Sequence, residues 1–179
     1  MTRDDLRCFC ALDIDFEAVG LLEPGVDQEP YFCTPEGAEH VGRLGVDGIH
    51  FILLPGDERV FCVDPAMGEE GTYVLPVAPD FRTFLSYVLY CRNANPISQI
   101  WWLTEERFRQ LLSEDGQAVW PGCEAFFVRR DGALESIAQT FGLTPVDPYG
   151  PVKELQGAFD ASVLRFSDAY YDILGLERK

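Results

Sequence analysis

The chain has 179 residues, of which 47% are hydrophobic and 25% are charged, the balance of an ordinary folded domain. Its formal net charge of −16 disfavours a nucleic-acid-binding or membrane-surface role, because like charges repel phosphate and anionic lipid. No apolar run approaches the ~20 residues of a membrane-spanning helix, and the acidic start does not resemble a secretory signal. These features predict one cytosolic domain over residues 1–179.

The negative charge is concentrated in the first half of the chain. Residues 1–90 hold 5 basic against 17 acidic side chains, whereas residues 91–179 hold 9 against 13. An acidic surface of this kind steers a basic protein toward itself. The alternative is that the charge serves solubility alone.

The first fifty residues predict one short helix followed by turns. Thr2 and Asp5 resemble a capping box, and apolar residues follow at near-helical spacing. Residues 21–48 are rich in Gly, Pro, Glu and Asp, which is typical of turns and loops. Within this stretch, residues 31–33 are compatible with a short edge strand.

Three β-rich runs come next, at residues 48–54, 59–63 and 72–77. Four residues with turn chemistry separate the first two runs, which predicts an antiparallel hairpin. The continuous hydrophobicity of these two runs indicates a central, covered position in the sheet. Pro76 favours an edge position for the third run, since proline cannot donate to a strand ladder.

The strongest helical pattern follows the strands. Pro79 and Asp80 open a helix in which apolar residues from Phe81 to Leu89 recur by three and one, as in a stripe that faces a sheet.

The remaining chain predicts further helices with one strand between them. The predicted helices cover residues 96–102, a segment that begins at Thr104, and residues 131–142. Residues 126–128 predict a strand, and residues 147–151 a break. The tail mixes helical spacing with apolar alternation, so both structures stay open. Together the pattern predicts an α+β fold, a mixed, mainly antiparallel sheet packed by helices.

Residues suited to chemistry are sparse. The chain has two histidines, His40 and His50, and no Cys-x-x-Cys pair, so we expect neither a zinc site nor a cofactor. The alternative is a set of three ligands from Cys8, Cys10 and His40. The six cysteines are expected to be reduced and mostly buried. No G-x-S-x-G turn and no phosphate-binding loop occurs, so we expect no enzymatic activity.

Two acidic pairs and a tryptophan pair are the candidate binding residues. Asp57–Glu58 and Glu69–Glu70 lie in the two connections between the predicted strands and should project from opposite ends of the sheet. Trp101 and Trp102 would point about 100° apart on a helix, so one could anchor a partner while the other is buried. The alternative is that both fill a junction between helices.

Part of the sequence resembles the SUKH superfamily. The segments VFCVDP at residues 60–65, YVLPVA at 73–78 and DFRTFL at 80–85 are similar to two strands and the following helix of that family. The resemblance covers about 45 residues and implies an α+β fold. Family members include many bacterial immunity proteins, which bind and neutralise toxins, and some eukaryotic regulators of cell-wall synthesis. The family pattern supplies no catalytic residues.

These observations predict a non-catalytic protein-binding module, immunity-like, that binds and neutralises a basic toxin domain. The expected contact residues are Asp57, Glu58, Glu69, Glu70, Trp101 and Trp102. The alternative is an enzyme or small-ligand receptor with a pocket between helices and sheet, in which His50 or a buried carboxylate with a raised pKa takes part.

Overall fold

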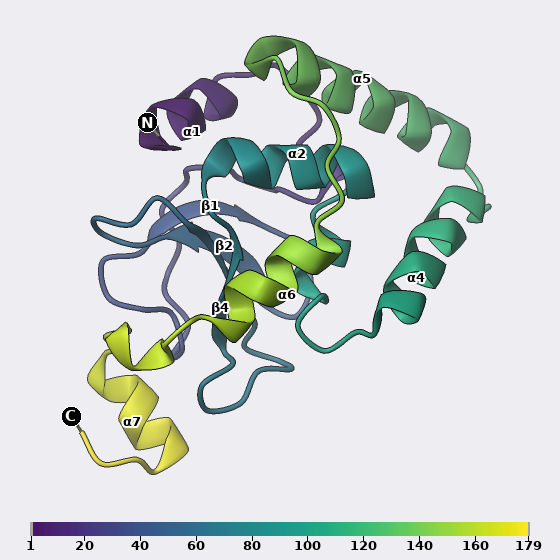
Figure 1. Ribbon diagram of the computed structural model, residues 1–179. Coiled ribbons are helices and arrows are strands. Elements are labelled where there is room, and N and C mark those ends of the chain that lie inside the picture. Colours follow the sequence, from purple (N-terminus) through teal and green to yellow (C-terminus); the bar gives the residue numbers. More distant parts are fainter. Residues whose placement is uncertain (1, 179) are drawn as a thin grey trace.

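A four-stranded antiparallel sheet lies at the centre of the computed structural model, which describes residues 2–178 (Figure 1). The strands are neighbours in chain order, so the sheet is a meander. This confirms the predicted α+β class and its mainly antiparallel sheet. The strands are β1 (Glu39–Arg43), β2 (His50–Leu53), β3 (Val60–Val63) and β4 (Val74–Ala78).

The central and edge positions follow the sequence pattern. β2 and β3 are buried at every residue and pair antiparallel, which confirms the predicted hairpin and its covered position. β4 is an edge strand, and its Pro76 lies opposite Phe61. A proline is tolerated at an edge because one side of the strand needs no hydrogen-bond partner.

The other edge strand, β1, was not predicted. Its sequence, EHVGR, is short, contains charged residues and a glycine, and lies within the stretch assigned to turns. A register shift between His40 and Gly42 interrupts the alternation that would have marked it. The strand predicted at residues 31–33 is wrong, because the Thr34 amide donates to the Tyr31 carbonyl in a turn.

The first predicted helices are present. α1 (Thr2–Cys10) opens the chain, and the short 3-10 helix η1 (Glu17–Val19) follows it. α2 (Phe81–Cys91) begins where predicted, because the Asp80 carboxylate accepts a hydrogen bond from the Thr83 amide at 2.8 Å. α2 lies across one face of the sheet (Figure 1).

The next helices differ in part from prediction. α3 (Asn95–Ser98) is shorter than the predicted 96–102. α4 (Glu105–Gln117) begins next to the predicted start at Thr104, whose hydroxyl accepts a hydrogen bond from the Arg107 amide. α5 (Cys123–Phe141) includes residues 126–128 and 131, so the predicted strand and the predicted start at Asp131 are both wrong. Three β-favouring residues in a row do not outweigh the packing of a 19-residue helix.

The tail is helical where it is regular. α6 (Tyr149–Gly157), the 3-10 helix η2 (Ala161–Val163) and α7 (Asp168–Leu174) follow α5. The predicted break at 147–151 therefore ends at Pro148. Pro151 lies in the first turn of α6, where an amide hydrogen would have no helical acceptor.

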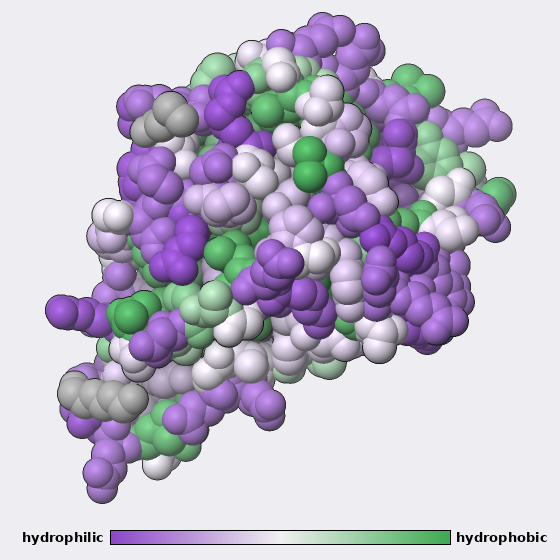
Figure 2. Space-filling view, in the orientation of Figure 1, coloured by the Kyte–Doolittle hydropathy of each residue, from purple (hydrophilic) through white to green (hydrophobic). Residues whose placement is uncertain are grey.

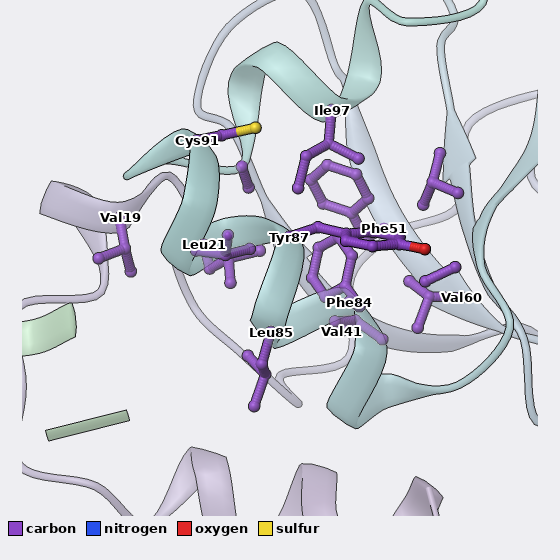
Figure 3. Packing of buried hydrophobic residues seen from close by; sticks show 14 of the residues in the cluster. Val19, Leu21, Val41, Phe51, Val60, Phe84, Leu85, Tyr87, Cys91 and Ile97 are labelled. Atoms are coloured by element: carbon purple, nitrogen blue, oxygen red, sulfur yellow. The ribbon is translucent and has the colours of Figure 1, made fainter. Parts of the chain in front are cut away.

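The sheet is covered by apolar side chains on both faces. On one face Phe51 of β2 packs against Phe84 of α2 in the main core (Figure 3). Leu53 of β2 and Leu85 of α2 belong to the same core. On the opposite face Ile52 and Phe61 join a smaller cluster that the C-terminal segment completes. That cluster includes Cys33, Val63, Val74, Phe159, Leu164, Phe166 and Tyr170.

The main core sets the stability of the fold. Phe84 is fully buried, and its ring lies 4.9 Å from that of Phe51, so Phe84→Ala should lower the free energy of unfolding by about 3–5 kcal/mol. Met67→Ala, at a side chain that is 58% exposed, is the control and should change it by less than about 0.5 kcal/mol. Urea denaturation followed by circular dichroism measures both; equal losses would contradict the assigned core.

Candidate functional site

A hollow of about 440 Å³ lies beside the edge of the sheet formed by β1 and β2. Its size is within the range of small-ligand sites. One wall comes from the loop of residues 27–38, and the other from β1, β2 and the turn between these strands. Both histidines of the chain line this hollow.

Strand alternation places the histidines on the hollow side. Successive side chains on a strand point to opposite faces, and Phe51 of β2 faces the main core. His50 and Ile52 therefore share the opposite face. His40 lies opposite Ile52 in the register of β1 and β2, which brings the two imidazole rings together.

Three aromatic rings form a stack at the base of the hollow. The centroid of the His50 ring lies 5.5 Å from that of Tyr31 and 5.9 Å from that of His40, and both pairs are nearly parallel. Gly48 makes room for this stack, because a β-carbon at that position would lie 2.6 Å from the Tyr31 ring. Gly48 also has φ of +69°, a conformation that favours glycine.

A hydrogen-bond chain fixes the tautomer of His50. Its Nδ1 lies 2.7 Å from the Gly48 carbonyl, which can only accept, so Nδ1 carries the proton. Nε2 then accepts from the Thr34 hydroxyl at 3.3 Å, and that hydroxyl accepts from the Tyr31 amide. Burial lowers the pKa of His50, although the Gly48 carbonyl opposes the fall. The His50 ring is therefore neutral, and hydrogen bonds at both of its nitrogens fix its orientation.

His40 has no comparable support. It is only 7% exposed, and neither ring nitrogen makes a hydrogen bond of normal geometry, although the Glu23 carbonyl lies close enough to oppose part of the pKa change. Burial, and then the neighbouring His50, lower the pKa of His40 to about 4. His40 is thus neutral at pH 7, with an unsatisfied polar edge at the base of the hollow.

The walls of the hollow carry mostly negative charge. The carboxylates that line it, all on exposed residues, are Asp27, Glu29, Glu36 and Asp47. Arg43 is the basic residue in the lining, and its Nε donates to Glu23 at 2.7 Å. That ion pair neutralises Arg43, so the acidic groups determine the sign of the field at the hollow.

The predicted acidic pairs lie at opposite ends of the sheet, as the meander requires. Asp57 accepts hydrogen bonds from the side chain and amide of Arg59, and these lower its pKa despite partial burial. Glu58 accepts from the Thr2 amide at 2.9 Å, which ties α1 to the β2–β3 turn. Both carboxylates are therefore engaged within the chain.

Glu69 and Glu70 lie on the exposed β3–β4 connection. His50, Val63 and Val74 are partners across β2, β3 and β4, so this connection leaves the same end of the sheet as the β1–β2 turn. Glu69 and Glu70 thus share that end with Asp47, one of the carboxylates of the hollow.

The tryptophans separate as the helical geometry suggested, although α3 ends before them. Trp102 is 46% exposed, whereas the indole nitrogen of Trp101 is buried without a hydrogen-bond partner. A third residue, Trp120, is also exposed and packs on Phe126 and Phe127 at the start of α5. Trp101, Trp102 and Trp120 are absent from the lining of the hollow.

The cysteines behave as buried or isolated thiols. All six are free, and Cys33, Cys62 and Cys91 are buried. Burial raises the pKa of Cys33 to about 12, so this thiol stays protonated at neutral pH. Within residues 2–178, no three His, Cys, Asp or Glu side chains gather as a metal site requires, so the set of Cys8, Cys10 and His40 is not assembled.

The chain matches no protein-family model, no curated protein and no solved structure. Within residues 2–178, no helix has both the length and the apolar character needed to cross a membrane.

Sequence reasoning named His50 but did not join it to His40. The pattern assigned residues 21–48 to turns, so it gave no strand on which His40 could face His50. The signal that indicates the pair is the placement of one histidine on each side of a turn that contains Gly45 and Gly48. If both flanking segments are strands, the two rings can lie on the same face of the hairpin.

Asp57 should matter for stability, in contrast to Glu69. Asp57→Asn removes the charge that holds Arg59 and should lower the free energy of unfolding at pH 7 by roughly 1 kcal/mol. Because the folded pKa is lowered, this contribution is present above about pH 4 and is lost as the pH falls below it. Urea denaturation at pH 7 and pH 3, with Glu69→Gln as the control, measures the difference. An equal effect of both variants would contradict the structural role.

His40 should make the fold weaker in mild acid. The unfolded chain binds a proton near pH 6.5 and the folded chain only near pH 4, so the free energy of unfolding falls as the pH drops between these values. His40→Phe removes the titrating group and should flatten part of this fall. Urea denaturation at pH 7 and pH 5 measures it; an unchanged fall in the variant would contradict the assignment.

Proposed function

We propose that this chain is a non-catalytic protein-binding module of the cytosol whose partner is a basic protein. The observation that carries the proposal is the position of the exposed carboxylates. Asp47 of the hollow and Glu69 and Glu70 of the β3–β4 connection share one end of the sheet in a chain of net charge −16. A basic surface approaching this end would be steered by the summed field.

The finer proposal is an immunity-like role, in which the partner is a basic toxin domain that binding neutralises. Its support is the resemblance of residues 48–92 to the SUKH superfamily, together with the α+β fold. Neutralisation by binding needs a complementary surface and no reacting group, which agrees with the engaged state of Asp57 and of His50.

The proposed contact surface has charged and aromatic parts. Glu69 and Glu70 supply long-range attraction, and Trp102 supplies an exposed aromatic group of the kind that often carries binding energy. Asp57 and Glu58 contribute to the field, but their hydrogen bonds within the chain make them weaker candidates for direct contact. Hydrophilic residues dominate the face shown in Figure 2, with small, separated hydrophobic groups between them.

A second candidate function is the binding of a small ligand in the hollow. The observation that favours it is His40, a buried ring without a normal hydrogen bond in a hollow of about 440 Å³. If this second function holds, a small molecule would bind in the hollow in the absence of any partner protein. Substitution of Glu69 and Glu70 would then leave the binding of a partner unaffected.

The first test asks whether a basic toxin domain is encoded beside the gene of this chain, and that domain is then purified with the chain. The two proteins should form a complex on size-exclusion chromatography, and the toxin's activity should fall as the complex forms. Glu69→Gln with Glu70→Gln should lower the association rate constant several-fold at low salt, because rim charges act mainly on the encounter. Surface plasmon resonance at two salt concentrations measures it.

The matched control carries the same change of charge elsewhere. Glu124→Gln with Glu135→Gln alters two exposed residues of α5, neither of which belongs to the proposed surface. This pair should change the rate constant far less. Equal effects of the two pairs would mean that only the net charge of the chain matters and would contradict the assigned surface. The absence of any complex with a basic toxin would contradict the immunity role.

A further inference from the structure

A second hollow lies on the face of the sheet opposite α2, beside the C-terminal segment. This hollow, the tail pocket, has a volume of about 450 Å³ and is lined by residues of the β3–β4 connection and β4, within 70–74, and of the tail, within 161–177. Its lining shares no residue with the hollow beside β1. Glu70 is one of the lining residues, so the tail pocket adjoins the surface that we assign to the partner.

The wall of the tail pocket is apolar and incompletely covered. Two tyrosines and three apolar side chains of the lining pack against the smaller core cluster but are only half-buried. They are Tyr73, Leu164, Phe166, Tyr171 and Leu176. An apolar group in the pocket would remove their remaining surface from water, which is favourable. The occupant should therefore have an apolar part.

A largely buried hydroxyl opens into the tail pocket. Tyr170 is only 6% exposed, and its ring is fixed by stacking on Phe166, with 3.9 Å between the ring centroids. Within residues 2–178 the Tyr170 hydroxyl makes no hydrogen bond, and this oxygen is not fully enclosed. Since Tyr170 lines the pocket, its hydroxyl faces that space and can accept a hydrogen bond from an occupant.

The charge at the tail pocket is negative. The charged residues in its lining are Glu70 and Glu177, and both are exposed. Arg178 is paired with two carboxylates of α7, so it does not neutralise them. Burial, and then the charge of Glu70, raise the pKa of Tyr170, which means that this carboxylate acts on the hydroxyl at short range. A cationic group that donates hydrogen bonds is therefore favoured at this position.

These features together select a lysine side chain. Its four-carbon stem covers an apolar wall while its charged end stays at a polar rim. The ammonium is compact and carries three donors, so it can serve a carboxylate and a hydroxyl together. One face of the Tyr170 ring is already covered by Phe166, which leaves less ring surface for the planar guanidinium of an arginine.

We propose that the tail pocket is the anchor site for the basic partner and takes a lysine side chain of that partner. The stem lies along the apolar wall, and the ammonium is directed at the Glu70 carboxylate and the Tyr170 hydroxyl. This inference rests on the proposed function, since it names the side chain that the partner inserts.

The tyrosines make the tail pocket observable. Of the seven in the chain, Tyr73, Tyr170 and Tyr171 line the pocket, and the other four serve as internal controls. Ring ¹³C labelling of tyrosine gives signals that single substitutions to phenylalanine assign. Titration uses the blocked peptide acetyl-Gly-Lys-Gly-amide at constant ionic strength. It should shift the three pocket signals saturably, with a dissociation constant on the order of millimolar, and leave the other four in place.

Matched peptides separate the stem from the charge. Norleucine in place of lysine keeps the stem and loses the charge, whereas 2,4-diaminobutyric acid keeps the charge and shortens the stem. Each should bind more weakly than lysine, by about threefold or more. The arginine peptide should bind no more tightly than the lysine peptide. Equal binding of the lysine, norleucine and diaminobutyric acid peptides, tighter binding of arginine, or no saturable shift would overturn the proposal.

Two variants with matched controls test the contacts. Glu70→Gln should weaken binding of the lysine peptide about two- to fivefold, whereas Glu124→Gln, at an exposed glutamate of α5, should leave it unchanged. Tyr170→Phe keeps the stacked ring, removes the hydroxyl and should also weaken binding about two- to fivefold. Tyr31→Phe, at a tyrosine outside the tail pocket, is its control. Equal effects of a variant and its control would contradict the assigned contact; circular dichroism checks that each variant is folded.

The outcomes separate this proposal from the function on which it rests. A chain that binds a basic partner, but whose pocket signals do not respond to the lysine peptide, retains the proposed function and loses the tail pocket as its anchor site. A chain whose pocket signals respond to the lysine peptide, but which binds no basic protein, loses the proposed function and retains a lysine-binding pocket.

Discussion

The side-to-side alternation of the β1–β2 hairpin is the constraint on which both the core and the candidate site depend. Phe51 and Leu53 face α2 and the main core, so His50 and Ile52 must face the other side. The pairing of His40 with Ile52 then brings a second imidazole to that side. A one-residue slip of this register would move the histidines into the core and the apolar residues to the hollow.

The two faces of the sheet are covered by different parts of the chain, and this difference creates the hollow. α2 covers the main core, whereas Tyr170 and other residues of the C-terminal segment cover the opposite face at β3 and β4. Toward β1, the loop of residues 27–38 replaces that segment and leaves an open volume. Both histidines are almost completely buried there, but they lie beside an open volume and are not packed by apolar side chains on every side.

The fold places exposed acidic residues at one end of the sheet and paired acidic residues at the other. At one end of the sheet the β2–β3 turn ties its carboxylates to Arg59 and to the amide of Thr2. At the other end Asp47, Glu69 and Glu70 are exposed on two turns. Exposed charges attract a partner, whereas paired charges mainly stabilise the fold. The acidic pairs Asp57–Glu58 and Glu69–Glu70 therefore have different roles although their sequences are similar.

Local sequence patterns are sufficient to predict the α2 helix that begins after Asp80, the β2–β3 hairpin, the edge position of the strand with Pro76, and the acidic balance. Periodicity and turn chemistry are properties of neighbouring residues, so they can be read directly. The strand at EHVGR, the helical state of residues 126–128 and the contact between His40 and His50 arise from the three-dimensional fold. These outcomes depend on pairing and packing between distant segments, which outweigh weak local preferences.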